Sequence, residues 1–166
     1  MAQSALSAIG RAAKLATIGA VKTAGDVTEA VVGAVRDVLL TTVDGAAQVV
    51  VAAEQGAANV VRGAIHAVSD TGQDVGVVAK SAVRGTVKAA NEVGGDLGKT
   101  AVAAVGASVK AAEEIGADTG KALKHAVAGA VEAAGEISES AVKTVSDALV
   151  TSVKGAKDVI KSPFKQ

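Results

Sequence analysis

The stretch Val83-Arg84-Gly85-Thr86-Val87-Lys88-Ala89-Ala90-Asn91-Glu92-Val93-Gly94 is one copy of a sequence repeat, and its pattern recurs along the chain with a 22-residue period. Residues 61–72 read VRGAIHAVSDTG one period earlier, and residues 105–116 read VGASVKAAEEIG one period later. A column of branched apolar residues follows the same step along the chain: Val21, Val43, Ile65, Val87, Val109, Val131 and Val153. Each copy presents the same surface and must bury it against something similar. The repeat therefore specifies an architecture, but it names no reaction.

The repeat has the periodicity of an α-helix. One period divides into two units of eleven, and eleven residues make three helical turns at about 3.67 residues per turn. Apolar residues recur at spacings of three and four, whereas strand alternation at period two is not sustained anywhere. We therefore predict an all-α fold, with long amphipathic helices packed as a helical bundle or a larger assembly.

The glycines have to be reconciled with that prediction, since there are 19 of them and each costs about 1 kcal/mol in a helix interior relative to alanine. Three Gly-x-x-x-Gly pairs recur at the 22-residue spacing, and Val/Ile pairs occupy the equivalent positions halfway between them. A partner helix displaced by half a period, or about 16 Å, would place valines over the glycine gaps. The predicted helix-packing residues are Gly72, Gly76, Gly94, Gly98, Gly116, Gly120, Val61, Ile65, Val83, Val87, Val105, Val109, Val127 and Val131.

The same glycines permit a second architecture. Gly72, Gly94 and Gly116 could end helices as C-caps, and the aspartates two residues later could begin the next helices as N-caps. The chain would then be a zigzag α-hairpin stack or solenoid, with helices of roughly 16 to 20 residues. The stretch 1–60 lacks this Gly-x-Asp signal, so we expect a longer helix there. We favour long helices, kinked in places, over a full zigzag.

The polar side of the repeat sorts its charges by sign. A lysine column contains Lys22, Lys88, Lys99, Lys110, Lys121, Lys143 and Lys154. Four positions on, an acidic column contains Asp26, Asp37, Asp70, Glu92, Glu114, Glu136, Asp147 and Asp158. Pairs of this spacing are neighbours on one helix and contribute at most a few tenths of a kcal/mol each. We favour a solvated zwitterionic face over an ion-pair ladder between chains.

Composition and chain ends restrict the class of protein. Apolar residues make up 49% of the chain but aromatics only 1%, so the core must be built mainly from alanine and valine. Seventeen basic residues balance 17 acidic ones, and no net field attracts nucleic acid. We divide the chain into a basic amphipathic N-terminal helix (1–25), a repeat region (26–160) and a C-terminal tail (161–166). We see no secretory signal or transmembrane segment, and a cytoplasmic location is favoured.

Chemistry-bearing motifs are not found in the sequence. His66 and His125 fall in different columns of the polar side and are expected to be solvated rather than to act as ligands or bases. Residues 94–100 (GGDLGKT) superficially resemble a phosphate-binding loop, but the spacing is one residue short and no apolar strand precedes it. We therefore expect no catalytic residues, no cofactor and no metal site, and we expect that the protein is not an enzyme.

The 11-residue, Val/Ala/Thr/Gly-rich pattern over residues 9 to 160 resembles several helix families. They are the synucleins and perilipin-type lipid-droplet coats, the granule-coating phasins, and the late embryogenesis abundant proteins. The synuclein core Lys-Thr-Lys-Glu-Gly-Val does not occur here, so the resemblance concerns period and composition. It implies an amphipathic coat of lipid or polymer granules, or a stress protectant. The residues themselves favour a structural protein that self-assembles through its repeated small-residue faces, with a homo-oligomer or higher assembly as the expected partner.

Overall fold

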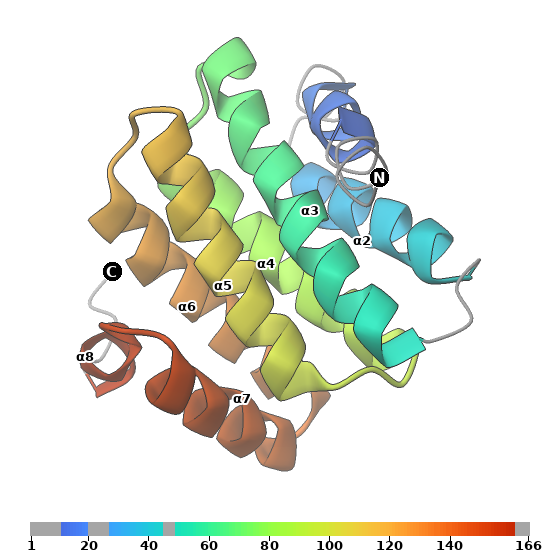
Figure 1. Cartoon of the computed structure of the whole chain (residues 1–166), viewed down its shortest axis with the longest axis vertical. Coiled ribbons are helices and arrows are strands. Elements are labelled where there is room, and N and C mark those ends of the chain that lie inside the picture. Colours follow the sequence, from blue (N-terminus) through green and yellow to red (C-terminus); the bar gives the residue numbers. More distant parts are fainter. Residues whose placement is uncertain (1–10, 20–26, 45–48, 162–166) are drawn as a thin grey trace.

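Every long segment of the described chain is helical. The computed structural model describes residues 11–19, 27–44 and 49–161, and no strand occurs within these ranges. A helix at residues 11–19 precedes the labelled elements, which are α2 (Val27–Asp44), α3 (Val49–Thr71), α4 (Val75–Glu92), α5 (Leu97–Glu114), α6 (Thr119–Ile137), α7 (Glu139–Ser152) and α8 (Ala156–Lys161). The helices pack against one another as a bundle (Figure 1), and the expected all-α fold is confirmed.

The chain reverses direction at the Gly-x-Asp sites. Gly94 and Gly116 both have φ of +71°, the left-handed conformation that favours glycine. After α4, the N–H of Gly95 donates to the Ala90 carbonyl at 2.8 Å, and the N–H of Gly94 donates to Asn91 at 3.3 Å. This is the Schellman pattern, and the Gly116 turn repeats it with Ala117 donating to Ala112. The carboxylates of Asp74, Asp96 and Asp118 then accept backbone N–H groups as N-caps of α4, α5 and α6.

Our preference for long helices over a zigzag is therefore wrong, and the hairpin stack is the observed architecture. In a helix that continued through these sites, each glycine would lower the stability of the helix, and no contact would offset that loss. A left-handed cap followed by an N-cap satisfies the end groups of two helices at once. The longer helix expected within the stretch 1–60 is also wrong: α2 ends at Asp44, α3 begins at Val49, and the two helices pack against each other.

The helices form two layers. The helices α2, α4, α6 and α8 contact one another in that order, and α3, α5 and α7 do the same in the second layer. In Figure 1, α3 and α5 lie side by side in front of α4. Since successive helices alternate between layers, one 22-residue repeat is a helix with its turn. Two repeats make the structural unit of the stack.

Small residues allow the helices of one layer to approach closely. A Cβ on Gly85 of α4 would lie 2.8 Å from the Val32 carbonyl oxygen of α2. A Cβ on Gly129 of α6 would collide with the Lys80 carbonyl of α4. These two glycines are two repeat periods apart and occupy equivalent places in successive units. The backbone contact between helices takes the place of bulky side chains in a core of alanine and valine.

The chain ends are described only in part. Within the predicted N-terminal region 1–25, residues 11–19 form a helix that packs through Ala13 and Thr17, both buried. Lys14 Nζ lies 2.9 Å from an Asp70 carboxylate oxygen at the end of α3. The other residues of that region lie outside the described ranges. Lys161 ends α8, and the remainder of the predicted tail, 162–166, also lies outside them.

Candidate interaction surface

The predicted packing glycines divide into two groups. The first member of each pair, Gly72, Gly94 or Gly116, lies at a turn with positive φ, and a Cβ there would meet no atom within 4 Å. These three are caps and not packing residues, so their assignment to a helix interface is wrong. The second members begin the next helices.

Of the second members, Gly76 and Gly98 do make contacts between helices. A Cβ on Gly76 would lie 2.7 Å from His125 Cδ2 of α6. A Cβ on Gly98 would lie 3.1 Å from Ala148 Cβ of α7. Gly120 meets only its own cap, Asp118, at 3.3 Å.

The predicted apolar packing residues lie in or beside the core between the layers. Six of them are fully buried: Val61, Ile65, Val83, Val87, Val105 and Val127. Val109 and Val131 are half-buried. Gly85 and Gly129 make the closest contacts with the backbone of another helix, yet neither was among the predicted residues. Their spacing of two repeat periods is the signal that would have found them.

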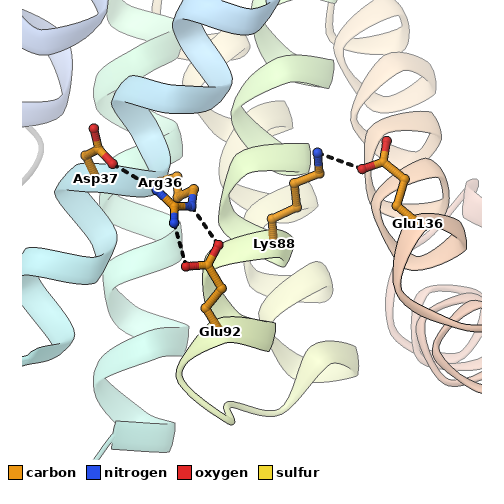
Figure 2. A network of polar contacts seen from close by, with 5 residues as sticks. All are labelled: Arg36, Asp37, Lys88, Glu92 and Glu136. Atoms are coloured by element: carbon orange, nitrogen blue, oxygen red, sulfur yellow. Dashed lines mark hydrogen bonds and ion pairs between the residues drawn. The ribbon is translucent and has the colours of Figure 1, made fainter.

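Charged side chains on the outer faces form ion pairs between helices of the same layer. Arg36 of α2 pairs with Glu92 of α4, and Lys88 of α4 pairs with Glu136 of α6 at 2.6 Å (Figure 2). Lys80 also reaches Glu132 of α6 at 2.9 Å. Lys88 and Glu92 are the lysine and acid of one repeat, four positions apart, but each binds a different neighbouring helix. The ladder therefore lies within one chain, between its helices.

The ladder itself repeats with the sequence. Glu114 accepts hydrogen bonds from Arg62 at 2.7 and 3.0 Å and lies 2.8 Å from His66 Nε2, across α3 and α5. One period later, Glu136 binds Arg84 and Lys88 in the same arrangement, across α4 and α6. The same contact pattern thus stabilises both layers.

These contacts shift the pKa values of the carboxylates. The hydrogen bond from Lys88 lowers the pKa of Glu136 below its ordinary value, against an opposing effect of burial. At Glu114, burial alone would raise the pKa, but the hydrogen bonds from His66 and Arg62 outweigh it and the pKa is lowered. The hydrogen bond from Lys121 lowers the pKa of Asp74. These carboxylates are stabilised in their charged form.

The outer face of α5 departs from this pattern. Four positions that recur with the 22-residue period are Lys80, Ser81, Arg84 and Gly85 in α4, and Lys124, His125, Ala128 and Gly129 in α6. In α3 they are Ala58, Asn59, Arg62 and Gly63, and in α7 they are Ser146, Asp147, Val150 and Thr151. In α5 they are Val102, Ala103, Gly106 and Ala107. Of the five helices, α5 alone has neither a charged residue nor a histidine at these positions.

Two shallow grooves lie on either side of these four positions of α5. The first, of about 280 Å³ between α5 and α7, is lined by Gly98, Lys99, Val102, Ala103, Ala148 and Ser152. The second, of about 270 Å³ between α3 and α5, is lined by Ala58, Asn59, Arg62, Val102, Ala103, Gly106, Ala107 and Lys110. Because Val102 and Ala103 line both, the grooves form one surface on either side of α5. We call the exposed stripe of α5 from Lys99 to Glu113 the α5 face.

Gly106 lies at the centre of the α5 face. It is exposed in the middle of a helix, and a Cβ there would meet no atom within 4 Å. Gly85 and Gly129 offset their helix-propensity cost by close contact with a neighbouring helix, whereas Gly106 gains no such contact with the part of the chain that the structure describes. None of the residues at this centre was among those predicted for packing. Comparing the repeat copies position by position is the signal that would have found them.

The two histidines and the glycine-rich stretch 94–100 lie at contacts and turns of the helix stack. His66 lies beside Glu114, and His125 lies against Gly76 of α4, where burial lowers its pKa. Residues 94–96 belong to the turn between α4 and α5 and residues 97–100 begin α5, where the Asp96 carboxylate accepts the Lys99 N–H at 2.9 Å. In the described ranges, no three His, Cys, Asp or Glu residues are grouped to hold a metal ion. Nor is any helix there long and apolar enough to cross a membrane.

Comparison with known proteins found no matching family model, no matching curated protein and no matching solved structure.

Proposed function

We propose that the protein is a non-enzymatic structural protein, a two-layer helical-repeat scaffold that assembles with other copies of itself through the α5 face. The observation that carries the proposal is the uncharged centre of this face, where the repeat elsewhere places charged side chains or a histidine. A repeat protein commonly uses an extended face for binding while its repeat interfaces hold the fold together. Here the departure from the repeat coincides with two grooves and an exposed mid-helix glycine.

The burial of the core valines also favours the α5 face as the site of self-association. Valines of α4 to α6 such as Val83, Val105 and Val127 are fully buried between the layers. A helix whose apolar stripe is covered by its own chain has little left to offer a lipid surface. The small side chains at the centre of the α5 face, in contrast, would let the backbone of another helix come close.

Light scattering during size-exclusion chromatography, over a range of concentrations, tests the proposal. We expect the mass to rise with concentration above the 16.0 kDa of one chain. Val102→Lys should hold the protein at the single-chain mass, because it places an additional positive charge in the interface beside a face that already carries Lys99 and Lys110. Val77→Lys is the matched control: Val77 is an exposed valine of α4, in the other layer, and this variant should assemble like the wild type. A wild type of single-chain mass at every concentration contradicts the proposal.

A coat of lipid or polymer granules is the second candidate. The observation in its favour is Leu15, which is 69% exposed on the helix at residues 11–19. Residues 1–25 carry Arg11, Lys14 and Lys22 and no acidic residue, and such a segment is attracted to anionic lipid. Co-flotation with anionic vesicles that is lost in Leu15→Asp, but kept in Val77→Asp, supports the coat. Failure of the wild type to float with vesicles excludes a lipid coat.

A further inference from the structure

The geometry points to a specific mode of self-association, which rests on the proposed function: two copies pair their α5 helices antiparallel about a two-fold axis at Gly106. Two-fold interfaces are the commonest in homo-oligomers and place the same patch on both sides. Such an axis through residue 106 sets residue 106−n of one copy opposite residue 106+n of the other. The consequences for the α5 face can therefore be read from the sequence.

Helical spacing gives the residues that face the partner. Lys99, Val102, Gly106, Lys110 and Glu113 follow one another at steps of three and four, so they form one stripe on the helix. All five are exposed or partly exposed in the structure. At a rise of 1.5 Å per residue the stripe is about 21 Å long.

Charge complementarity selects the register. With the axis at Gly106, Lys99 of one copy lies opposite Glu113 of the other, and symmetry makes this contact twice. Lys110 lies opposite Val102, over which its aliphatic stem can pack. An axis midway between Ala103 and Gly106 would instead set Lys99 opposite Lys110, and like charges in contact disfavour that pairing. Among the described residues, neither Lys99 nor Glu113 has an ion-pair partner within the chain, so both are available.

The proposed pairing explains why an exposed glycine stands in the middle of α5. At the axis Gly106 meets its own copy, and the absence of a Cβ lets the two helix backbones approach closely. The flanking grooves extend the contact to α3 and α7, through Asn59 on one side and Ser152 on the other. One helix face with two groove edges is a small interface, so we expect a reversible dimer of micromolar rather than nanomolar affinity.

Charge exchange tests the register. Lys99→Glu alone and Glu113→Lys alone each create two like-charge contacts per dimer, and each should weaken dimerisation about tenfold or more. The double variant restores opposite charges, and its dissociation constant should return to within about threefold of the wild type. Both substitutions are compatible with the helix, since an acid near its N-terminus and a base near its C-terminus suit the helix dipole. Circular dichroism of the diluted variants checks that the fold is kept.

Cysteine cross-linking tests the axis, because the chain has no cysteine of its own. Gly106→Cys should form a disulfide dimer under mild oxidation, since two residues on the axis come within the Cα separation of about 4.4–6.8 Å that a disulfide needs. Gly33→Cys of α2 is the matched control: a Cβ there also meets no atom within 4 Å, and it should not cross-link.

The outcomes separate the two proposals. A wild type that is monomeric throughout removes the proposed self-assembly and this pairing with it. A wild type that dimerises, with no rescue by the double charge exchange and equal cross-linking of the two cysteine variants, overturns this pairing alone. Rescue together with selective cross-linking at residue 106 supports it.

Discussion

Arg36 and Glu92 are far apart in the sequence, yet they form a bidentate pair, with Arg36 Nε and Nη2 donating to the two Glu92 carboxylate oxygens at 2.6 and 2.7 Å (Figure 2). The hydrogen bond and the charge of Glu92 raise the pKa of Arg36. The pair joins α2 to α4, two helices of one layer separated along the chain by α3. Glu92 belongs to the acidic column of the repeat, so this column connects neighbouring helices of one layer.

The ladder makes stability depend on pH. The pKa of Glu136 is lowered in the folded protein, so its contribution is fully present above its ordinary pKa of 4.5 and is lost as the pH falls through the folded value. Asp74 and Glu114 are lowered too and act in the same direction. We expect the free energy of unfolding in urea to decrease as the pH is lowered below about 5. Glu136→Gln should lose less stability over this window than the wild type. An unchanged pH dependence in that variant would count against the assigned pairs.

The close approach of α4 and α6 at Gly129 predicts a cost for any side chain there. Gly129→Ala should destabilise the protein by about 1–3 kcal/mol, because its Cβ would collide with the Lys80 carbonyl, which cannot move away easily. Gly33→Ala is the control. It adds a methyl group where no atom lies within 4 Å, and it should gain up to about 1 kcal/mol from helix propensity. Urea unfolding measures both. Equal gains in the two variants would show that α4 and α6 are not in backbone contact.

The turns predict a different response to substitution. Gly94→Ala should cost about 1–2 kcal/mol, because an L side chain resists the positive φ even though its Cβ would meet no neighbour. Gly94→Asn should cost less, since asparagine tolerates this conformation better. Equal losses for alanine and asparagine in thermal unfolding would contradict a conformational origin.

The caps of the next helices can be tested separately. Asp74→Ala removes the acceptor for the Gly76 and Val77 N–H groups and the partner of Lys121, and it should cost about 1 kcal/mol or more. Asp74→Asn keeps a capping oxygen but loses the negative charge. It should therefore fall between the wild type and the alanine variant in urea unfolding. An asparagine variant no more stable than the alanine variant would mean that the cap contributes little.

The helical periodicity and the buried columns were predictable because they depend on spacing alone. The sequence alone did not predict the turns at Gly94 and Gly116, because the same residue pattern fits a glycine that packs at the edge of a continuous helix and a glycine that ends a helix. Only the hydrogen bonds to Ala90 and Ala112 distinguish them. The ion-pair partners of the charged residues could not be predicted either. Lys88 and Glu92 are close together on one helix, but Lys88 pairs with α6 and Glu92 pairs with α2. Once the arrangement of the layers is known, these contacts between alternate helices follow from the repeat.

We expect the chain to be folded in the absence of lipid. Because the core residues of α4 to α6 are covered by other helices of the same chain, the ordering entropy is offset within the protein itself. We expect strong helical circular dichroism in plain buffer, a cooperative loss on heating, and little change on adding vesicles. An amphipathic coat would behave in the opposite way: it would be weakly helical alone and gain helix when vesicles provide the apolar surface. A chain that becomes helical only with lipid would refute the hairpin stack as the free state and favour the coat.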